Sequence, residues 1–188
     1  MLHAVVSMLV WWAGDAWAWE LTWRADSWLR RPWTLWTTAW VHINTPHLIG
    51  NQLAVGALAA MAWLLRPHAG TSVAWLLTWP LSTLILLLWP QIGYFAGLSG
   101  LVHAAVAVVG VHLLAGEMRI PKARRWGGLL LLGLVIKLGL ERAWLWPVVW
   151  NDSANMSIVQ AVHLTGALVG AVLALVFMRQ RPGWFRSG

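Results

Sequence analysis

Residues 97–104 read GLSGLVHA, and an uninterrupted apolar run, AVAVVGVHLL, follows over residues 105–114. Such a run is typical of a membrane helix, because an apolar segment of about 20 residues spans the hydrocarbon core of a bilayer. A serine flanked by glycines, with a histidine one helical turn later, is unusual at the start of such a helix. Polar side chains in membrane helices usually face the protein interior and are candidates for function. The stretch therefore predicts both a membrane-spanning helix and a polar site at its beginning.

The composition of the whole chain also indicates a membrane protein. Of the 188 residues, 60% are hydrophobic and 10% are charged, whereas about a quarter of the residues are charged in ordinary soluble domains. Cysteine is absent, which excludes thiolate nucleophiles, disulfides and cysteine-ligated metals. We expect one domain, residues 1–188, because most of this length is needed for the membrane spans.

Apolar runs bounded by charge, proline or glycine predict six spans. They cover approximately residues 1–19, 47–65, 72–89, 98–116, 126–146 and 155–178. The expected fold is therefore an all-α membrane protein built as a six-helix bundle. Residues 20–46 differ, because five tryptophans lie there among three arginines. This mixture suits the headgroup zone, so we expect a loop embedded in the membrane surface.

The first span has an alternative interpretation as a cleaved signal peptide. Ala16-Trp17-Ala18 resembles a cleavage site that would remove residues 1–18. However, no Lys or Arg precedes the apolar core, as the first region of a signal peptide requires. We therefore favour a retained span.

Basic residues predict the orientation of the chain. If six spans alternate, the N-terminus, residues 66–71, residues 117–125 and the C-terminal tail share one side. That side holds a single acid, Glu117, and eight cations: Arg66, Arg119, Lys122, Arg124, Arg125, Arg179, Arg181 and Arg186. The other charges balance, so the net charge of +7 lies there. The positive-inside rule makes this side cytoplasmic, with both termini inside. The basic excess thus indicates contact with anionic lipid, and no nucleic-acid partner is expected.

Three of the spans run in the same direction and carry polar side chains near their outer ends. The stretch HINTPHLIGN, residues 42–51, places His47 and Asn51 four residues apart, on one stripe of a helix. Ser99 and His103 share a stripe in the same way, and His163 lies about two turns into the last span. Three helices would therefore bring a hydroxyl, imidazoles and an amide to one depth in the membrane.

These residue types fit acyl transfer by an activated serine. The Ser99 hydroxyl is a weak nucleophile until a base takes its proton, and both His163 and His103 are candidates for that base. No acid is expected near these residues, so a serine–histidine dyad is the simplest arrangement. We expect no metal and no cofactor.

The tetrahedral oxyanion formed by such a serine needs hydrogen-bond donors. His47, Asn51 and backbone N–H groups at the start of the helix could provide them. Gly97 would let the backbone turn tightly beside the serine. Alternatively, His47 and Asn51 could line a cavity, or bind a metal together with His42.

Small residues predict which spans pack closely. Gly166, Gly170 and Ala174 recur every fourth residue in the last span, and Gly100 and Ala104 do so in the span that begins at residue 98. Small residues at this spacing let membrane helices approach, although the pattern alone more often reflects packing than function. Close approach of these two spans is what a bond between the serine and the histidine would require.

Four further residues receive no catalytic role. His3, His68 and His112 lie at the ends of spans or on the cytoplasmic side. Lys137 lies within a span, where its long side chain could reach the outer interface or mark a substrate path.

Three motifs in order, HINTPHLIGN, GLSG and VHLTGALVG, resemble those of the rhomboid intramembrane serine proteases over about residues 30–178. The resemblance implies that Ser99 is the nucleophile and His163 the general base, with His47 and Asn51 at the oxyanion site. It also implies that residues 20–46 form the membrane-embedded first loop. The expected substrate is a transmembrane protein, cut near the outer, periplasmic face of a bacterial inner membrane.

Two departures from the family pattern indicate a branch. Thr38 stands where the family usually has an additional histidine, and His103 stands where an aromatic residue often packs on the catalytic histidine. The run from Ser99 to Ala104 looks most like the rhombosortase branch, with alanine replacing the last glycine of its SGxxHG pattern. That branch is thought to process surface proteins with a C-terminal Gly-Gly signal, an apolar helix and a basic tail. The alternatives are a general rhomboid protease and an inactive rhomboid-like protein that only binds transmembrane partners.

Overall fold

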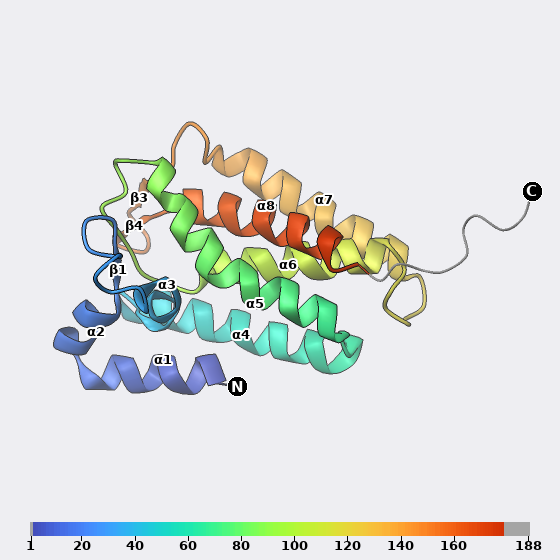
Figure 1. Ribbon diagram of the computed structural model, residues 1–188, viewed down its shortest axis with the longest axis horizontal. Helices are drawn as coiled ribbons and strands as arrows, with labels where there is room; N and C mark the ends of the chain where they lie inside the picture. Colours follow the sequence, from blue (N-terminus) through green and yellow to red (C-terminus); the bar gives the residue numbers. More distant parts are fainter. Residues whose placement is uncertain (1, 179–188) are drawn as a thin grey trace, which may run out of the picture.

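Six long helices form a bundle in which consecutive helices run in opposite directions (Figure 1). The computed structural model describes residues 2–178. The long helices are α1 (Leu2–Ala13), α4 (Thr45–Leu65), α5 (Ala69–Leu84), α6 (Ser99–Leu114), α7 (Ala123–Glu141) and α8 (Gln160–Val176). The shorter elements are α2 (Asp15–Leu21), α3 (Thr34–Thr37), the 3-10 turns η1 (Thr38–Trp40) and η2 (Ile85–Leu88), and the strands β1 (Trp23–Arg24), β2 (Tyr94–Phe95), β3 (Val149–Asn151) and β4 (Met156–Ile158).

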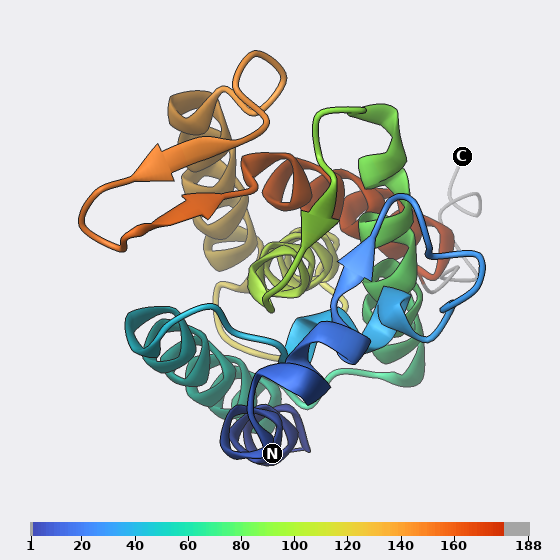
Figure 2. The ribbon, with the colours of Figure 1, turned by 90° about the vertical axis from the view of Figure 1, so that its left-hand side faces the viewer.

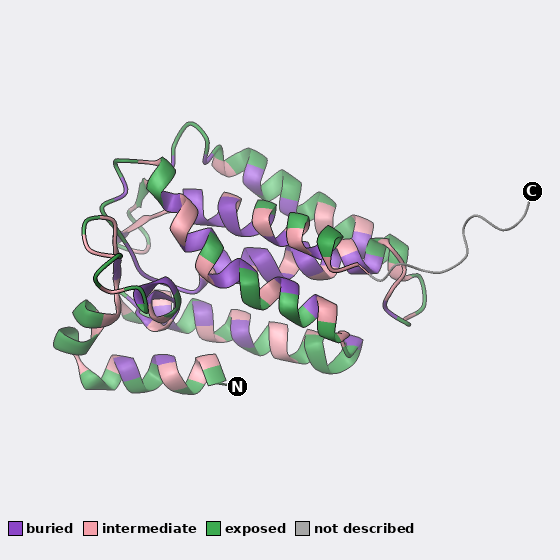
Figure 3. Ribbon diagram, in the orientation of Figure 1, coloured by how far each residue is buried: buried purple, intermediate pink, exposed green. Residues whose placement is uncertain are grey.

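Helix α6 lies at the centre of the bundle, with α4, α5, α7 and α8 around it and α1 outside α4 (Figure 2). Most of α6 and one face of α8 are buried, whereas α4 and α7 are largely exposed (Figure 3). The outward faces carry large apolar side chains such as Leu53, Trp63 and Leu140. An exposed apolar surface of this kind suits contact with lipid. The helix that begins with Ser99 is therefore the one most shielded from the surroundings.

Glycines allow α6 and α8 to approach until their backbones touch. A Cβ atom added to Gly166 would lie 2.2 Å from the carbonyl oxygen of Gly100, and one added to Gly170 would lie 2.9 Å from that of Ala104. No larger side chain fits at such distances. The expected close packing of these two spans is confirmed.

The helix bounds differ from the predicted spans at three places. Gly14, with φ 87°, breaks the first span into α1 and α2. Helix α7 ends at Glu141 rather than 146. Residues 149–158, part of which we assigned to the last span, form an antiparallel hairpin, because a polar turn with Asn155 at φ 48° reverses the chain before α8 begins. The two short strand pairs also make the expected all-α class mostly helical rather than purely so.

Two of the described helices meet the length and hydropathy of a complete membrane span by themselves. They are Thr45–Leu65 and the continuous stretch Ala69–Leu88. Leu2–Ala13, Ser99–Leu114 and Gln160–Val176 are apolar but shorter. The count of six spans therefore stays a prediction.

Residues 20–46 pack against the segment that precedes α6. The Thr38 hydroxyl accepts a hydrogen bond from the Trp23 backbone N–H at 3.2 Å and donates one to the Phe95 carbonyl. The Thr38 carbonyl accepts the Gly97 N–H at 2.9 Å. Trp23 is completely buried, although Trp33 remains exposed as expected of a headgroup anchor. This loop is therefore a structural support for the chain entering α6 as well as a surface segment.

The basic turns lie at the end of the bundle opposite Ser99. The turns at residues 66–68 and 115–122 and the start of α1 share that end (Figure 1). This arrangement agrees with the alternation used to predict orientation. Arg179, Arg181 and Arg186, which entered that prediction, lie outside the described residues.

Candidate active site

Ser99 is the first residue of α6 and faces a cavity of about 360 Å³ at one end of the bundle. The cavity is also lined by His47 from α4, His163 from α8 and the β3–β4 hairpin. The sequence predicts that Ser99, His47 and His163 share one depth, and the structure brings them to one cavity. No hydrogen bond joins the Ser99 hydroxyl to His163 among the described residues. Such catalytic bonds often tighten only when a substrate is bound.

His163 is held by an acidic residue that the sequence did not lead us to expect. Its Nδ1–H donates to the Glu141 carboxylate, with distances of 2.9 and 3.0 Å to the two oxygens. The side chains are 7% and 15% exposed, respectively. Lys137, one helical turn before Glu141, donates to the same carboxylate. The expectation that no acid lies near these residues is therefore wrong, because a glutamate lies beside His163.

The signal for Glu141 was present in the sequence. It lies four residues after Lys137, on one stripe of α7, and near the outer end of the predicted span 126–146. A lysine within a membrane span usually pairs with an opposite charge, so Glu141 could have been expected beside Lys137. Neither explanation that the sequence offered for Lys137 included Glu141 as its partner. Those explanations were a side chain that reaches the interface and a marker of the substrate path.

His103 supports His163 rather than contacting the serine hydroxyl. Its Nδ1–H donates to the Ser99 carbonyl oxygen at 2.7 Å, one turn back along α6. Its ring stacks on that of His163, with centroids 4.1 Å apart and planes inclined by 13°. His103 thus fills the space beneath the His163 ring, which favours His163 as the base.

The proposed oxyanion donors both lie beside Gly97, on the side where a Cβ atom would be. A Cβ atom at Gly97 would lie 2.7 Å from His47 Nε2 and 4.0 Å from Asn51 Nδ2, and Gly97 adopts φ 128°. His47 Nδ1 accepts the Ile43 N–H at 3.4 Å, so a neutral ring carries its proton on Nε2. Asn51 Nδ2 is buried and has no partner among the described residues. Two N–H groups of α4 therefore lie against the backbone just before the serine.

The hypothesis of a metal bound by His42 and His47 gains no support. His42 Nδ1–H donates to the Trp40 carbonyl at 3.1 Å, and its ring meets that of His47 edge-on at 5.0 Å. Burial, together with the neighbouring His47, lowers the pKa of His42 to about 4. The described residues bring no third ligand to this pair. A neutral His42 is therefore a packing partner of His47.

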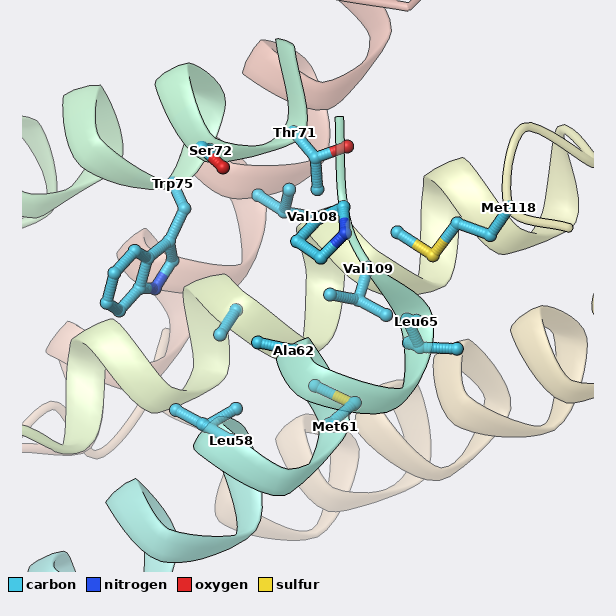
Figure 4. A pocket seen from close by; sticks show the side chains of 12 residues that line it. Leu58, Met61, Ala62, Leu65, Thr71, Ser72, Trp75, Val108, Val109 and Met118 are labelled. Carbon is cyan, nitrogen blue, oxygen red and sulfur yellow. The ribbon is translucent and has the colours of Figure 1, made fainter. Parts of the chain in front are cut away.

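A second cavity, of about 180 Å³, lies between α4, α5 and α6 toward the basic end (Figure 4). Its walls are apolar, with Leu58, Met61, Val108 and Met118 among the side chains that line it. Thr71 and Ser72 contribute the only hydroxyls of this lining. It contains no base or acid and offers no alternative catalytic site.

Comparison with known proteins identifies the family of the chain. No individual curated protein matches the chain. The Rhomboid domain family matches residues 29–180, which include every residue of the site. The chain therefore belongs to the rhomboid family, whose members are intramembrane serine proteases that act on transmembrane protein substrates.

Proposed function

We propose that this protein is an intramembrane serine protease in which Ser99, His163 and Glu141 act together. The observation that carries the proposal is the bond from His163 Nδ1–H to Glu141. Because Nδ1 holds the proton of the neutral ring, the lone pair lies on Nε2, which is the tautomer that a general base needs. Glu141 orients the ring and stabilises its positive charge once a proton arrives.

The reaction that fits this arrangement is two-step acyl transfer. The Ser99 hydroxyl attacks the scissile carbonyl while His163 Nε2 takes its proton, and the protonated ring then gives that proton to the leaving amine. Water attacks the resulting acyl-enzyme with the same histidine as base, which releases the new carboxylate and restores Ser99. His47 Nε2–H and Asn51 Nδ2–H would stabilise the oxyanion in both steps.

The same reasoning supports a single six-span domain with the site toward the periplasmic face of a bacterial inner membrane. The basic turns occupy the opposite end of the bundle, as the positive-inside rule requires of cytoplasmic loops. Both termini would then be cytoplasmic. A transmembrane substrate would be cut near its outer end.

Labelling by a fluorophosphonate probe in detergent tests the catalytic proposal. Labelling of the native chain should disappear in Ser99→Ala and fall strongly in His163→Ala. His103→Tyr should retain part of it, because tyrosine can still stack on His163. If His163→Ala instead retained labelling and His103→Tyr lost it, His103 would be the base. An unlabelled native chain, beside a serine hydrolase that reacts normally, would favour a rhomboid-like binding protein without activity.

Within the family, we propose a rhombosortase-like specificity. The support is His103, which lies four residues after the serine and stacks on the catalytic histidine. Co-expression with a reporter ending in a Gly-Gly signal, an apolar helix and a basic tail tests this specificity. Cleavage of a generic transmembrane helix without cleavage of that reporter would instead establish a general rhomboid protease.

A further inference from the structure

A second cluster of ionisable side chains lies at the end of the bundle opposite the active site. His68 immediately precedes α5, His112 lies in the last turn of α6, and Glu117 lies in the turn between α6 and α7. Proteolysis as proposed above uses none of them. The residue before α5 and the end of α6 with the turn after it thus bring two imidazoles and a carboxylate to one point.

The three side chains converge on a single carboxylate oxygen. His68 Nε2 lies 2.8 Å and His112 Nδ1 lies 2.6 Å from Glu117 Oε2. The imidazole rings meet edge-on, with centroids 4.9 Å apart. His112 and Glu117 are 0% and 4% exposed, and His68 is 10% exposed. The cluster is therefore almost completely buried, and only the His68 side chain has limited contact with the exterior.

The surrounding backbone holds this arrangement closely. A Cβ atom at Gly70 would lie 2.9 Å from Cε1 of the His68 ring, so glycine lets the ring lie against the start of α5. A Cβ atom at Gly127 would lie 2.4 Å from the Leu114 nitrogen, so α7 touches the end of α6 directly beside the cluster. The three donor atoms are thus presented by rigid, closely packed segments.

Two neutral imidazoles and one carboxylate form a ligand set that zinc takes in proteins, leaving a fourth position for water. With metal–ligand bonds of about 2.0–2.1 Å, tetrahedral geometry separates the ligand atoms by about 3.3 Å. The present separations from Glu117 Oε2 are shorter, so a metal ion requires each imidazole to move outward by less than about 1 Å. The ligand atoms of the three residues all lie within 4.8 Å of one another.

We propose that His68, His112 and Glu117 bind a divalent transition metal of the zinc class. The ion would link the α4–α5 turn to the α6–α7 turn. It would thereby stabilise the packing of the start of α5 against the end of α6. This role is separate from the chemistry at Ser99. The competing explanation is a hydrogen-bonded cluster that needs no metal, and the two differ in whether stability responds to added metal.

Metal titration of the full-length protein in detergent, after treatment with a chelator, distinguishes the two. The probes are Zn²⁺, followed by elemental analysis and thermal unfolding, and Co²⁺, followed by its visible absorption. The site should bind one equivalent per chain, with a tetrahedral cobalt spectrum and a higher unfolding temperature. Glu117→Gln should weaken binding at least 10-fold.

Glu141→Gln is the matched control, because Glu141, His103 and His163 form the other three-ligand group among the described residues. Binding lost in Glu117→Gln and retained in Glu141→Gln supports the proposal. Unchanged binding in Glu117→Gln, loss in Glu141→Gln alone, or no binding by the native chain overturns it. If Glu117→Gln does not fold, His68→Gln provides the same comparison, since His68 is the most exposed of the three ligands.

Discussion

Replacing Glu141 by glutamine is expected to slow catalysis while leaving substrate binding intact. Glutamine keeps the size of the side chain and an oxygen that can accept the Nδ1–H of His163, so the ring stays in place. The variant lacks the negative charge that stabilises the imidazolium formed when Ser99 loses its proton. Glu141 does not line the cavity, so KM should change little and the loss should appear in kcat.

The size of the effect follows from the strength of this hydrogen bond. A hydrogen bond to a charged group contributes about 1.5–3 kcal/mol, against about 0.5–1.5 kcal/mol for a neutral one. Two carboxylate oxygens of Glu141 lie 2.9 and 3.0 Å from His163 Nδ1, and both side chains are largely buried. The interaction is therefore expected near the upper limit of the range for charged groups. The nearby Lys137 already offsets part of the carboxylate charge. We therefore expect a loss of about 1.5–2.5 kcal/mol, or roughly 10- to 70-fold in kcat.

The assay is cleavage of a transmembrane reporter in detergent at saturating and limiting substrate. Lys137→Met serves as a control, because it leaves the carboxylate on His163 and should reduce kcat less. Thermal unfolding of both variants checks that the fold is retained. A folded Glu141→Gln protein that cleaves at more than half of the native kcat would refute a role for this carboxylate in catalysis.

Three further substitutions, one of them with a matched control, test the surrounding structure. Asn51→Ala should reduce kcat roughly 100- to 1,000-fold by removing an oxyanion donor, with little change in the unfolding temperature, since the Nδ2 atom has no partner to lose. Gly97→Ala should reduce kcat by roughly 100-fold, because its Cβ atom would displace the His47 ring and its φ of 128° disfavours a side chain; cleavage at the native rate would contradict this geometry. Gly166→Ala should destabilise the fold by about 1–3 kcal/mol through overpacking, whereas Gly133→Ala, which meets no atom within 4 Å, should be neutral or slightly stabilising in the same unfolding assay.

The parts of the site that the sequence predicted are those that depend on helix spacing. Ser99 with His103, and His47 with Asn51, lie four residues apart, and helical geometry alone puts each pair on one stripe. Small residues at the same interval correctly identified α8 as the close neighbour of α6. Periodicity of this kind depends only on local helix geometry, so it holds for any tertiary arrangement of the helices.

The features that the sequence did not predict depend on contacts between distant segments, or on where an apolar run stops being helical. Glu141 meets His163 across 22 residues, and nothing in the spacing of either helix specifies that pairing. The sequence pattern assigns residues 155–158 to the last span because they continue into its apolar run, whereas they form the second strand side of the hairpin at residues 149–158. Gly14 interrupts α1 and α2 by backbone conformation alone, which hydropathy does not register.

The side chain of Asn44 joins two parts of the catalytic end that could otherwise move independently. Its Oδ1 accepts the His47 N–H at 2.9 Å and caps α4, while its Nδ2 donates to the Ala154 carbonyl at 2.6 Å, in the turn of the β3–β4 hairpin. Separating the hairpin from α4 would break the second bond, at a net cost of about 1 kcal/mol. The first bond does not involve the hairpin. Movement of the hairpin would therefore leave the cap of α4, the helix that carries Asn51, in place. The amide of Asn44 thus both holds the hairpin and caps the helix that carries His47 and Asn51.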